Sequence, residues 1–296
     1  MITVEQKNAQ RNRNTIFSES GEIISVDEFP GNQFIMRIRA PKCAAKAEPG
    51  NFIHVKCDDS FSMRRPLSIM RVENDCLDIL YKIVGNGLRN LSTKYPGDII
   101  SLLGPIGQPF RPDENRPKAL LIGGGVGIPP MIYIADHLRQ LGGNWAPLVI
   151  LGSELPFPFK LQNSNIRTPW LDDKITSTMP LIESWGISCR LATLAGFKGC
   201  FDGYVTDLAD RWLSTLSSDE LAKVEIFSCG PMIMLRAVAT LAEKYSVPCQ
   251  VSLEEFMACA VGGCAGCTVK INTSNGDAMK RVCVDGPVFD ATTVVW

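Results

Sequence analysis

Four cysteines near the C-terminus constrain the fold of this chain more than any other feature of its sequence. Cys259, Cys264 and Cys267 follow the spacing C-x4-C-x2-C, and Cys283 comes after fifteen further residues. Mostly small residues separate the first three, so the backbone can fold tightly around a compact inorganic core and point N–H groups at the sulfur atoms. This spacing is that of a plant-type [2Fe–2S] centre. The segment is therefore predicted to enclose such a cluster, which carries one electron at a time.

Zinc binding and structural thiols are the alternative interpretations of these cysteines. A structural zinc site usually shows two C-x2-C-like pairs, whereas here the fourth cysteine stands alone with no histidine near it. Disulfides need an oxidising compartment, and residues 1–14 are polar, without the apolar segment of an export signal. The eleven cysteines are odd in number and scattered, unlike a disulfide framework. The sequence favours an iron–sulfur protein of the reducing cytoplasm.

Composition excludes two classes of partner. The formal net charge is -1 and no basic stripe is present, which argues against a nucleic-acid partner. The longest uncharged stretch, residues 119–135, contains glycines and prolines and is shorter than the roughly 20 residues of a membrane-spanning helix. We therefore expect a soluble protein without direct membrane insertion.

The first half of the chain is predicted to form a β-barrel. Residues 1–15 read as a flexible arm. Residues 16–112 combine short alternating strand patterns, as in Phe34-Ile35-Met36-Arg37-Ile38-Arg39, with closely spaced Pro-Gly turns. Several short strands with such turns favour a small antiparallel barrel. Residues 111–118, rich in proline and charge, read as a linker.

The second half is predicted to contain an α/β domain and a small C-terminal subdomain. Residues 118–247 alternate short apolar strands with helical stretches, the pattern of a parallel sheet covered on both faces. Within them, residues 152–180 are irregular and read as an inserted loop. Residues 248–296 would form the subdomain around the four cysteines.

Two glycine-containing turns follow apolar strands of the predicted sheet. Gly123-Gly124-Gly125-Val126-Gly127 precedes a helix, so a dinucleotide pyrophosphate can approach the backbone and the helix N-terminus. The order differs from the usual G-x-G-x-x-G, and tight packing also produces such turns. Cys229-Gly230-Pro231 ends a later strand, where ligands bind in open α/β sheets. Its alternative is a plain turn with Pro231 opening a helix.

Arg64-Arg65-Pro66-Leu67-Ser68 lies within the predicted barrel. Adjacent arginines before a rigid proline can clamp a diphosphate through bidentate hydrogen bonds, and a serine hydroxyl can meet a heteroaromatic ring edge. The alternative is a basic strand edge that discourages aggregation. His54 and His137, the two histidines, have no catalytic partner at a suitable spacing, so structural roles are expected for both.

These motifs occur together in a fixed order. They are Arg65-Pro66-Leu67-Ser68, Tyr81-Lys82-Ile83-Val84-Gly85-Asn86-Gly87, Leu103-Gly104-Pro105-Ile106-Gly107, Gly123 to Gly127, Cys229-Gly230-Pro231, and Leu253-Glu254-Glu255 through Cys283-Val284-Asp285-Gly286-Pro287-Val288-Phe289. In this order they resemble the ferredoxin-reductase-like flavoproteins, and specifically the electron-transfer subunits of the NAD-dependent (class 1B) dihydroorotate dehydrogenases. The resemblance covers residues 17–291, weakly between 153 and 185.

The resemblance implies an antiparallel β-barrel FAD domain, a Rossmann-like NAD domain and a small [2Fe–2S] subdomain. The residues implied at FAD are Arg65, Pro66, Leu67, Ser68, Tyr81, Lys82, Ile83, Gly87 and Leu88. Those implied at the nicotinamide are Gly124, Gly125, Gly127, Cys229, Gly230 and Pro231. The implied cluster ligands are Cys259, Cys264, Cys267 and Cys283. NAD(H) is preferred because Glu154, after the second sheet strand, offers a carboxylate to free ribose hydroxyls.

The resemblance also implies a function and a partner. Electrons would pass between NAD(H), FAD, the cluster and an FMN-containing catalytic subunit that oxidises dihydroorotate to orotate in pyrimidine synthesis. The two kinds of subunit would form a heterotetramer. A second hypothesis is that this chain is the same flavin/iron–sulfur module serving another partner, in a bifurcating transhydrogenase, a sulfide dehydrogenase or a hydrogenase. A third hypothesis is a non-enzymatic redox-sensing subunit, which Leu88, where the family usually has threonine, and the altered segment 193–196 would support.

Overall fold

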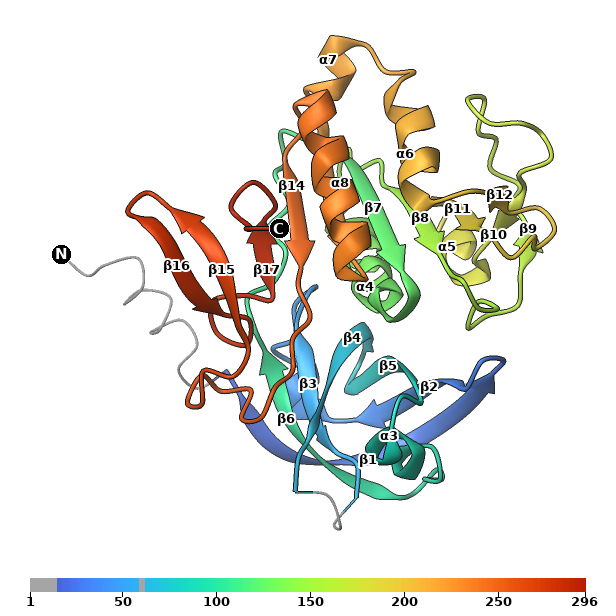
Figure 1. Cartoon of the computed structure of the whole chain (residues 1–296). Coiled ribbons are helices and arrows are strands. Elements are labelled where there is room, and N and C mark those ends of the chain that lie inside the picture. The colour runs from blue at the N-terminus through green and yellow to red at the C-terminus, as the bar shows by residue number, and fades with distance from the viewer. Residues whose placement is uncertain (1–14, 59–61) are drawn as a thin grey trace.

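Six antiparallel strands close into a barrel at the N-terminal end of the chain (Figure 1). The computed structural model describes residues 15–58 and 62–296, so the arm predicted at residues 1–15 falls, apart from Thr15, outside the described residues. The strand order is β1-β2-β5-β4-β3-β6. Their bounds are Phe17–Phe29 (β1), Gln33–Arg39 (β2), Phe52–Lys56 (β3), Arg65–Glu73 (β4), Cys76–Lys82 (β5) and Ile99–Ile106 (β6).

Alternation along β2 shows why these segments form a barrel. Phe34, Met36 and Ile38 are buried in the interior of the barrel. Arg37 and Arg39 point outward and pair with carboxylates. A period of two buries one face of a strand and leaves the other to solvent. Two short helices complete this domain, α2 (Pro41–Ala44) and α3 (Asn86–Leu91).

A seven-stranded sheet forms the second domain, in the order β12-β11-β8-β7-β13-β14-β17. Its strands are Lys118–Gly124 (β7), Leu148–Gly152 (β8), Ser188–Thr193 (β11), Phe201–Asp202 (β12), Val224–Cys229 (β13), Cys249–Ser252 (β14) and Val288–Asp290 (β17). The pairs are parallel except for β14 with β17, which is antiparallel. The predicted barrel and parallel sheet are thereby confirmed.

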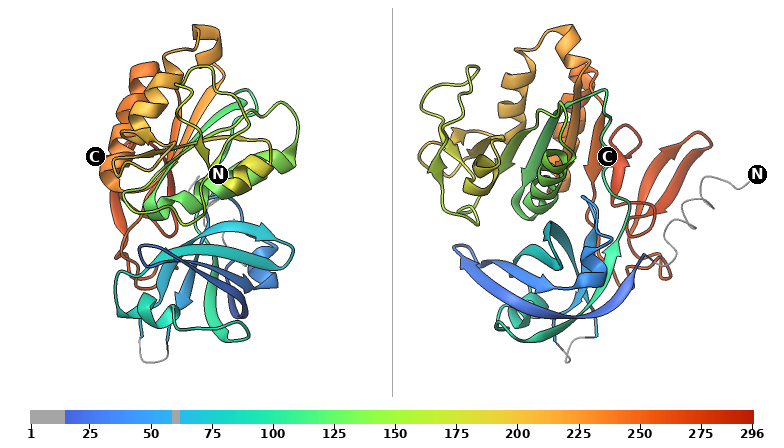
Figure 2. Two further views of the ribbon diagram at one scale, coloured as in Figure 1. Left: turned by 90° about the vertical axis from the view of Figure 1, so that its right-hand side faces the viewer. Right: turned by 180° about the vertical axis from the view of Figure 1, so that it is seen from behind.

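Helices cover both faces of this sheet (Figure 2). The helices are Ile128–Leu141 (α4), Pro180–Ser184 (α5), Val205–Leu213 (α6), Ser218–Leu221 (α7) and Met232–Tyr245 (α8), with a 3-10 turn at Gly125–Gly127 (η1). On β7, Leu121 packs in the cluster that contains residues of α4 and α5, whereas Leu120 and Ile122 pack in the one that contains residues of α6 and α8. Burial on both faces explains why this strand is a continuous apolar run.

The predicted insertion at 152–180 is mostly loop. It contains two short paired strands, Gln162–Asn163 (β9) and Ser177–Thr178 (β10). Phe157 anchors it by packing into the core beside Phe159 and Phe197. The insertion is therefore tied to the α/β domain by aromatic contacts.

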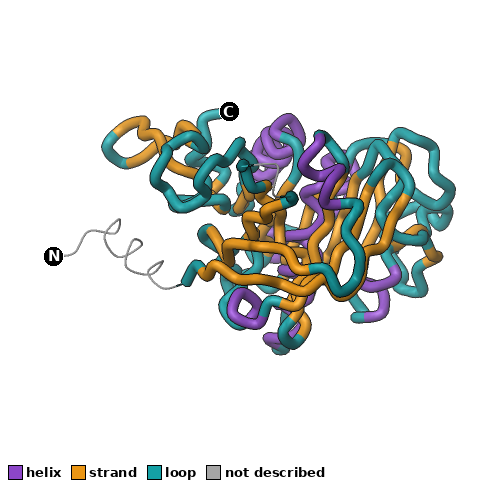
Figure 3. Tube along the Cα trace, turned by 90° about the horizontal axis from the view of Figure 1, so that it is seen from below, coloured by secondary structure: helices purple, strands orange, loops and turns teal. Residues whose placement is uncertain are grey.

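The C-terminal residues belong partly to the α/β sheet. β14 and β17 extend that sheet, and only the hairpin of Thr268–Thr273 (β15) and Gly276–Arg281 (β16) stands apart as a two-stranded sheet. In Figure 3 the hairpin lies at the left-hand end of the molecule, beside the C-terminus. The division predicted at residue 248 thus falls just before a strand of the larger sheet.

The barrel contacts the second domain along α4 and the inserted loop. The Tyr133 hydroxyl donates to the Ala47 carbonyl at 2.7 Å, and the Gln33 amide donates to the Pro156 carbonyl at 2.7 Å. Gln108 reaches the cysteine segment by donating to the Val284 carbonyl at 3.0 Å. These contacts bring the barrel, the carboxyl edge of the sheet and the cysteine segment together.

Candidate functional site

The two glycine-containing turns lie side by side at the carboxyl edge of the sheet. β7 and β13 are parallel neighbours, and Gly123 is level with Cys229 in their register. A methyl group on Gly127 would overlap the carbonyl of Cys229. Only a residue without a Cβ allows this close approach of the two backbones. The turns therefore form one continuous backbone surface at the edge where α/β proteins bind ligands.

One side chain that the sequence did not single out closes this surface. The Met234 side chain lies 2.5 Å from the positions that a Cβ on Gly124 or Gly230 would occupy. Met234 is on the first turn of α8, which begins after Pro231. No sequence motif indicates Met234, because its position at this surface depends on which face of α8 packs toward β7.

The Cys229 thiol points into the protein rather than toward this surface. Its residue is fully buried, and burial raises the pKa of the thiol. The thiol is therefore neutral near pH 7. Gly125, with φ of +55°, takes a left-handed conformation that bends the chain into α4.

The two adjacent arginines have different environments. Arg64 donates to the Ser101 carbonyl and hydroxyl, each at 2.8 Å, and so ties β4 to β6. Within the part of the chain that the structure describes, Arg65 donates to two backbone carbonyls, those of Met63 and Arg64. Its guanidinium lies 3.3–3.5 Å from where a Cβ on Gly87 would sit. A cation that pairs with no carboxylate of the described segments and lies beside a bare backbone suits a diphosphate.

The other residues predicted at FAD fall into two groups. Pro66, Ser68, Lys82 and Ile83 are half-buried, whereas Leu67, Tyr81 and Leu88 pack inside the barrel. The Tyr81 ring stacks on Phe34 with centroids 5.4 Å apart, and burial raises the pKa of its hydroxyl. A cofactor on the outer face of β5 would therefore meet the Tyr81 backbone rather than its ring.

His54 is enclosed between β3 and its neighbours. Both ring nitrogens are buried without a hydrogen-bond partner among the described residues. Burial, reinforced by the positive charge of Arg64, lowers the pKa of His54 to about 4. The imidazole is therefore neutral at physiological pH, and burial likewise lowers the pKa of His137 on α4.

The four predicted cluster ligands lie in two contacting pairs. The sulfur atoms of Cys267 and Cys283 are 3.4 Å apart, and the Cys264 N–H donates to the Cys259 sulfur at 3.4 Å. Two thiolates on one tetrahedral ion, with metal–sulfur bonds of about 2.3 Å, lie about 3.8 Å apart. The separation of the Cys267 and Cys283 sulfurs therefore fits two thiolates on one iron, and Cys259 with Cys264 would be the pair that holds a second.

Backbone N–H groups are directed at these sulfur atoms. The Gly266 N–H donates to the Cys264 sulfur at 3.5 Å. At Cys259 burial opposes ionisation, but hydrogen bonds from Val261, Cys264 and Gly263 outweigh it and lower the pKa of this thiol to about 7. At Cys283, burial and the neighbouring Cys267 thiol raise the pKa to about 12. The hydrogen bonds of the segment therefore favour a thiolate at Cys259, the form that binds iron.

Comparison with known proteins agrees with this geometry. Residues 254–295 match the model of the iron–sulfur cluster binding domain of dihydroorotate dehydrogenase B. A solved structure described as the NADH-dependent reduced ferredoxin-NADP oxidoreductase of flavin-based electron bifurcation is 26% identical, with a TM-score of 0.71 over 95% of this chain and 91% of that one. A ferredoxin reductase of carbazole 1,9a-dioxygenase shares the fold at 20% identity, with a TM-score of 0.58 over 79% of this chain and 67% of that chain.

The fold and the cysteine segment define the class, a ferredoxin-reductase-like oxidoreductase with an iron–sulfur segment. The electron transfer subunit of dihydroorotate dehydrogenase B (NAD(+)) from Caldanaerobacter subterraneus subsp. tengcongensis is 33% identical over 251 residues, 85% of this chain and 88% of that protein. The corresponding subunit from Desulforamulus reducens is 31% identical over 282 residues, 93% and 97% of the two chains. The chain belongs to this family of electron transfer subunits.

Proposed function

We propose that this protein carries electrons between NAD(H) and a catalytic subunit that oxidises dihydroorotate to orotate. The cysteine segment on a reductase fold is the observation that carries the proposal, because it combines a one-electron site with a dinucleotide surface in one chain. FAD, when bound to the barrel, exchanges a hydride with nicotinamide and single electrons with an iron–sulfur cluster. The protein would work in the cytoplasm. Among the described residues, no helix is long and apolar enough to cross a membrane.

The residues of the chain divide the work of binding and orientation. Arg65 would hold the diphosphate of FAD, Ser68 would meet the edge of its ring, and the backbone at Gly87 would let the phosphates approach. Gly124, Gly127 and Gly230 would let the two turns and Met234 pack closely, so that their backbones could face a nicotinamide over that ring. Hydride transfer requires that the donor and the acceptor be held in contact. The close approach of the two glycine turns would align them.

The partner is proposed to be an FMN-containing dihydroorotate dehydrogenase subunit, assembled with this chain as a heterotetramer. Cys264 is exposed and its N–H contacts the sulfur of the half-buried Cys259, so a cluster held there would be within reach of an external acceptor. NAD(H) is the proposed dinucleotide because Glu154 is exposed just after β8, where a carboxylate suits free ribose hydroxyls.

Anaerobically purified protein is expected to show flavin absorption near ~450 nm over broad iron–sulfur absorption, and NADH should bleach both. NADPH at the same concentration should act more slowly. Absorption spectra before and after each addition measure these changes. A spectrum without flavin, or one that NADH leaves unchanged, would contradict the proposal and favour a redox-sensing subunit.

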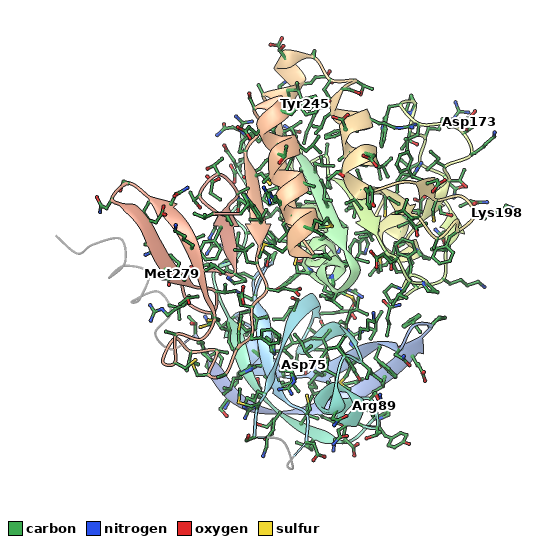
Figure 4. All side chains as sticks on the ribbon, viewed as in Figure 1. Asp75, Arg89, Asp173, Lys198, Tyr245 and Met279 are labelled. Atoms are coloured by element: carbon green, nitrogen blue, oxygen red, sulfur yellow. The ribbon has the colours of Figure 1, made fainter. Side chains whose placement is uncertain are left out.

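Replacement of Arg65 by glutamine is expected to weaken FAD binding by about 10- to 100-fold. The guanidinium has no carboxylate partner among the described residues, and charge-assisted hydrogen bonds contribute about 1.5–3 kcal/mol. The FAD content after gel filtration and titration of the apoprotein measure the change. Arg89→Gln is the control, because Arg89 is also near Gly87 in sequence but its side chain is exposed on α3 (Figure 4). Equal FAD affinity in both variants would contradict the proposed role.

A second candidate function is supported by the bifurcating oxidoreductase structure, which this chain matches over 95% of its length. The same module would then deliver electrons to a different catalytic subunit. Reconstitution with a dihydroorotate-oxidising subunit distinguishes the two. Dihydroorotate-dependent NAD⁺ reduction in the mixture supports the first proposal, whereas its absence with intact NADH oxidation favours the second.

A further inference from the structure

A cavity of about 570 Å³ lies at the end of the α/β domain opposite the glycine turns. Its floor includes the first residues of three parallel strands, Lys118 of β7, Leu148 of β8 and Ser188 of β11. β7 ends at Gly124, and at about 3.3 Å per residue the two ends of this strand are roughly 20 Å apart. A ligand in the cavity would therefore be separate from the nicotinamide.

Four of the five tryptophans of the chain line this cavity, namely Trp145, Trp170, Trp185 and Trp212. All four are half-buried. None of their indole N–H groups donates to another residue in the part of the chain that the structure describes. The Trp185 ring is covered by the Arg139 guanidinium, 5.3 Å from the ring centroid. The other three half-buried indoles provide apolar faces and free donors, which suits a planar ring with polar edges.

The charge of the cavity wall is positive. Lys118, Arg139 and Arg167 line it, and none of its lining residues is acidic. Lys118 is paired with a glutamate and Arg139 with an aspartate outside the lining. Arg167 is exposed and has no ion pair or hydrogen bond within the described residues. An anion entering the cavity would therefore meet one uncommitted guanidinium.

The wall that carries Arg167 is held in place by a buried cation. Arg190 of β11 is 3% exposed, and its guanidinium donates to the Ile166 carbonyl at 2.6 Å and to the Thr168 hydroxyl at 3.0 Å. These bonds tie the inserted loop to the sheet on both sides of Arg167. The wall is thus built into the domain.

An unsatisfied hydroxyl also lies in the lining. The Ser188 oxygen is buried and has no hydrogen-bond partner among the described residues. A buried polar group without a partner costs free energy, which a ligand that bonds to it would recover. This oxygen lies beneath the cavity surface, so a ligand would contact it once the Ser188 side chain turned toward the cavity.

We propose that this cavity binds an aromatic anion of nucleotide size, with the ring among the indoles and the anionic group at Arg167. Its volume is within the usual range of small-molecule sites. Trp170 belongs to the inserted loop and Trp145 follows the end of α4, so both segments contribute to the site. Its distance from the glycine turns makes it a second site.

Calorimetric titration of the holoprotein, with NAD⁺ saturating, tests the proposal with AMP, UMP, adenosine, uridine and inorganic phosphate. A nucleoside monophosphate should bind more tightly than either its nucleoside or phosphate, with a change in tryptophan fluorescence. Arg167→Gln should weaken binding about tenfold, because a charge-assisted hydrogen bond is lost. Lys198→Gln, an exposed change outside the cavity, should leave the affinity unaltered.

Trp170→Leu, which retains apolar volume against the core, should also weaken nucleotide binding while the thermal midpoint confirms folding. Undetectable binding of AMP and UMP at millimolar concentration would overturn the proposal. Equal affinity of Arg167→Gln and Lys198→Gln would overturn it too, since the anion would then be held elsewhere. NADH oxidation by each variant is recorded separately and does not enter this comparison.

Discussion

Replacement of Cys283 by serine is expected to abolish electron delivery to the catalytic subunit while NADH still reduces the flavin. Cys283 is 3% exposed and its sulfur contacts that of Cys267 at 3.4 Å. Serine keeps the shape of the side chain but provides a much poorer iron ligand. Because metal binding and the order of a small metal-binding segment are coupled, loss of one ligand should remove the cluster. We expect transfer to the partner to fall more than about 100-fold.

Three measurements separate this outcome from misfolding. Iron and acid-labile sulfide report the cluster, stopped-flow absorption reports reduction of the flavin by NADH, and dihydroorotate-dependent NAD⁺ reduction reports transfer to the partner. Cys249→Ser is the matched control, because Cys249 is also 3% exposed but lies in β14 among core residues. If the Cys283 variant retained the cluster and normal transfer, the proposed ligand set would be wrong.

The sequence predicted the cysteine segment and the carboxyl edge of the sheet because both depend on local patterns. Cysteine spacing follows from the chemistry of the cluster, and a continuous apolar run such as residues 119–122 indicates a strand buried on both faces. A glycine run between a strand and a helix then locates the edge where ligands bind. The order of these motifs along the chain, which resembles that of a known family, predicted the same two sites.

Other features depend on the packing of distant segments and could not be predicted. β14 and β17 are neighbours in the sheet although 35 residues separate Ser252 from Val288. The ring of Tyr81 points into the barrel, but β5 is buried from Cys76 to Tyr81, so no alternation indicates which side chains face inward. The different roles of Arg64 and Arg65 likewise follow from the position of Ser101 on another strand.

The two ends of the α/β domain differ in whether the sequence predicts a site there. The glycine turns at the carboxyl edge come from two recognisable motifs, whereas the cavity at the amino edge is lined by tryptophans from four separate segments. Trp145 and Trp212 are far apart in sequence and have no common spacing. A site assembled in this way becomes visible only when the strands place their amino ends together.

Replacement of Gly127 by alanine is expected to impair reduction by NADH about 100-fold while FAD and the cluster are retained. The added methyl group would overlap the backbone of Cys229 and Gly230. Since the overlap is with backbone, the two turns must move apart, at a cost of about 1–3 kcal/mol in stability. A displacement of about 1 Å between hydride donor and acceptor costs about 100-fold in rate.

Stopped-flow reduction by NADH, with FAD and iron contents and the thermal midpoint measured in parallel, tests the role of Gly127. Gly263→Ala is the control, because a Cβ at Gly263 would have no heavy atom within 4 Å and its backbone is not in the left-handed region. A normal NADH rate in Gly127→Ala would mean that the close approach of the two turns serves packing alone. A slow reduction by NADH with intact cofactors would instead show that hydride transfer depends on the spacing between the β7 and β13 backbones.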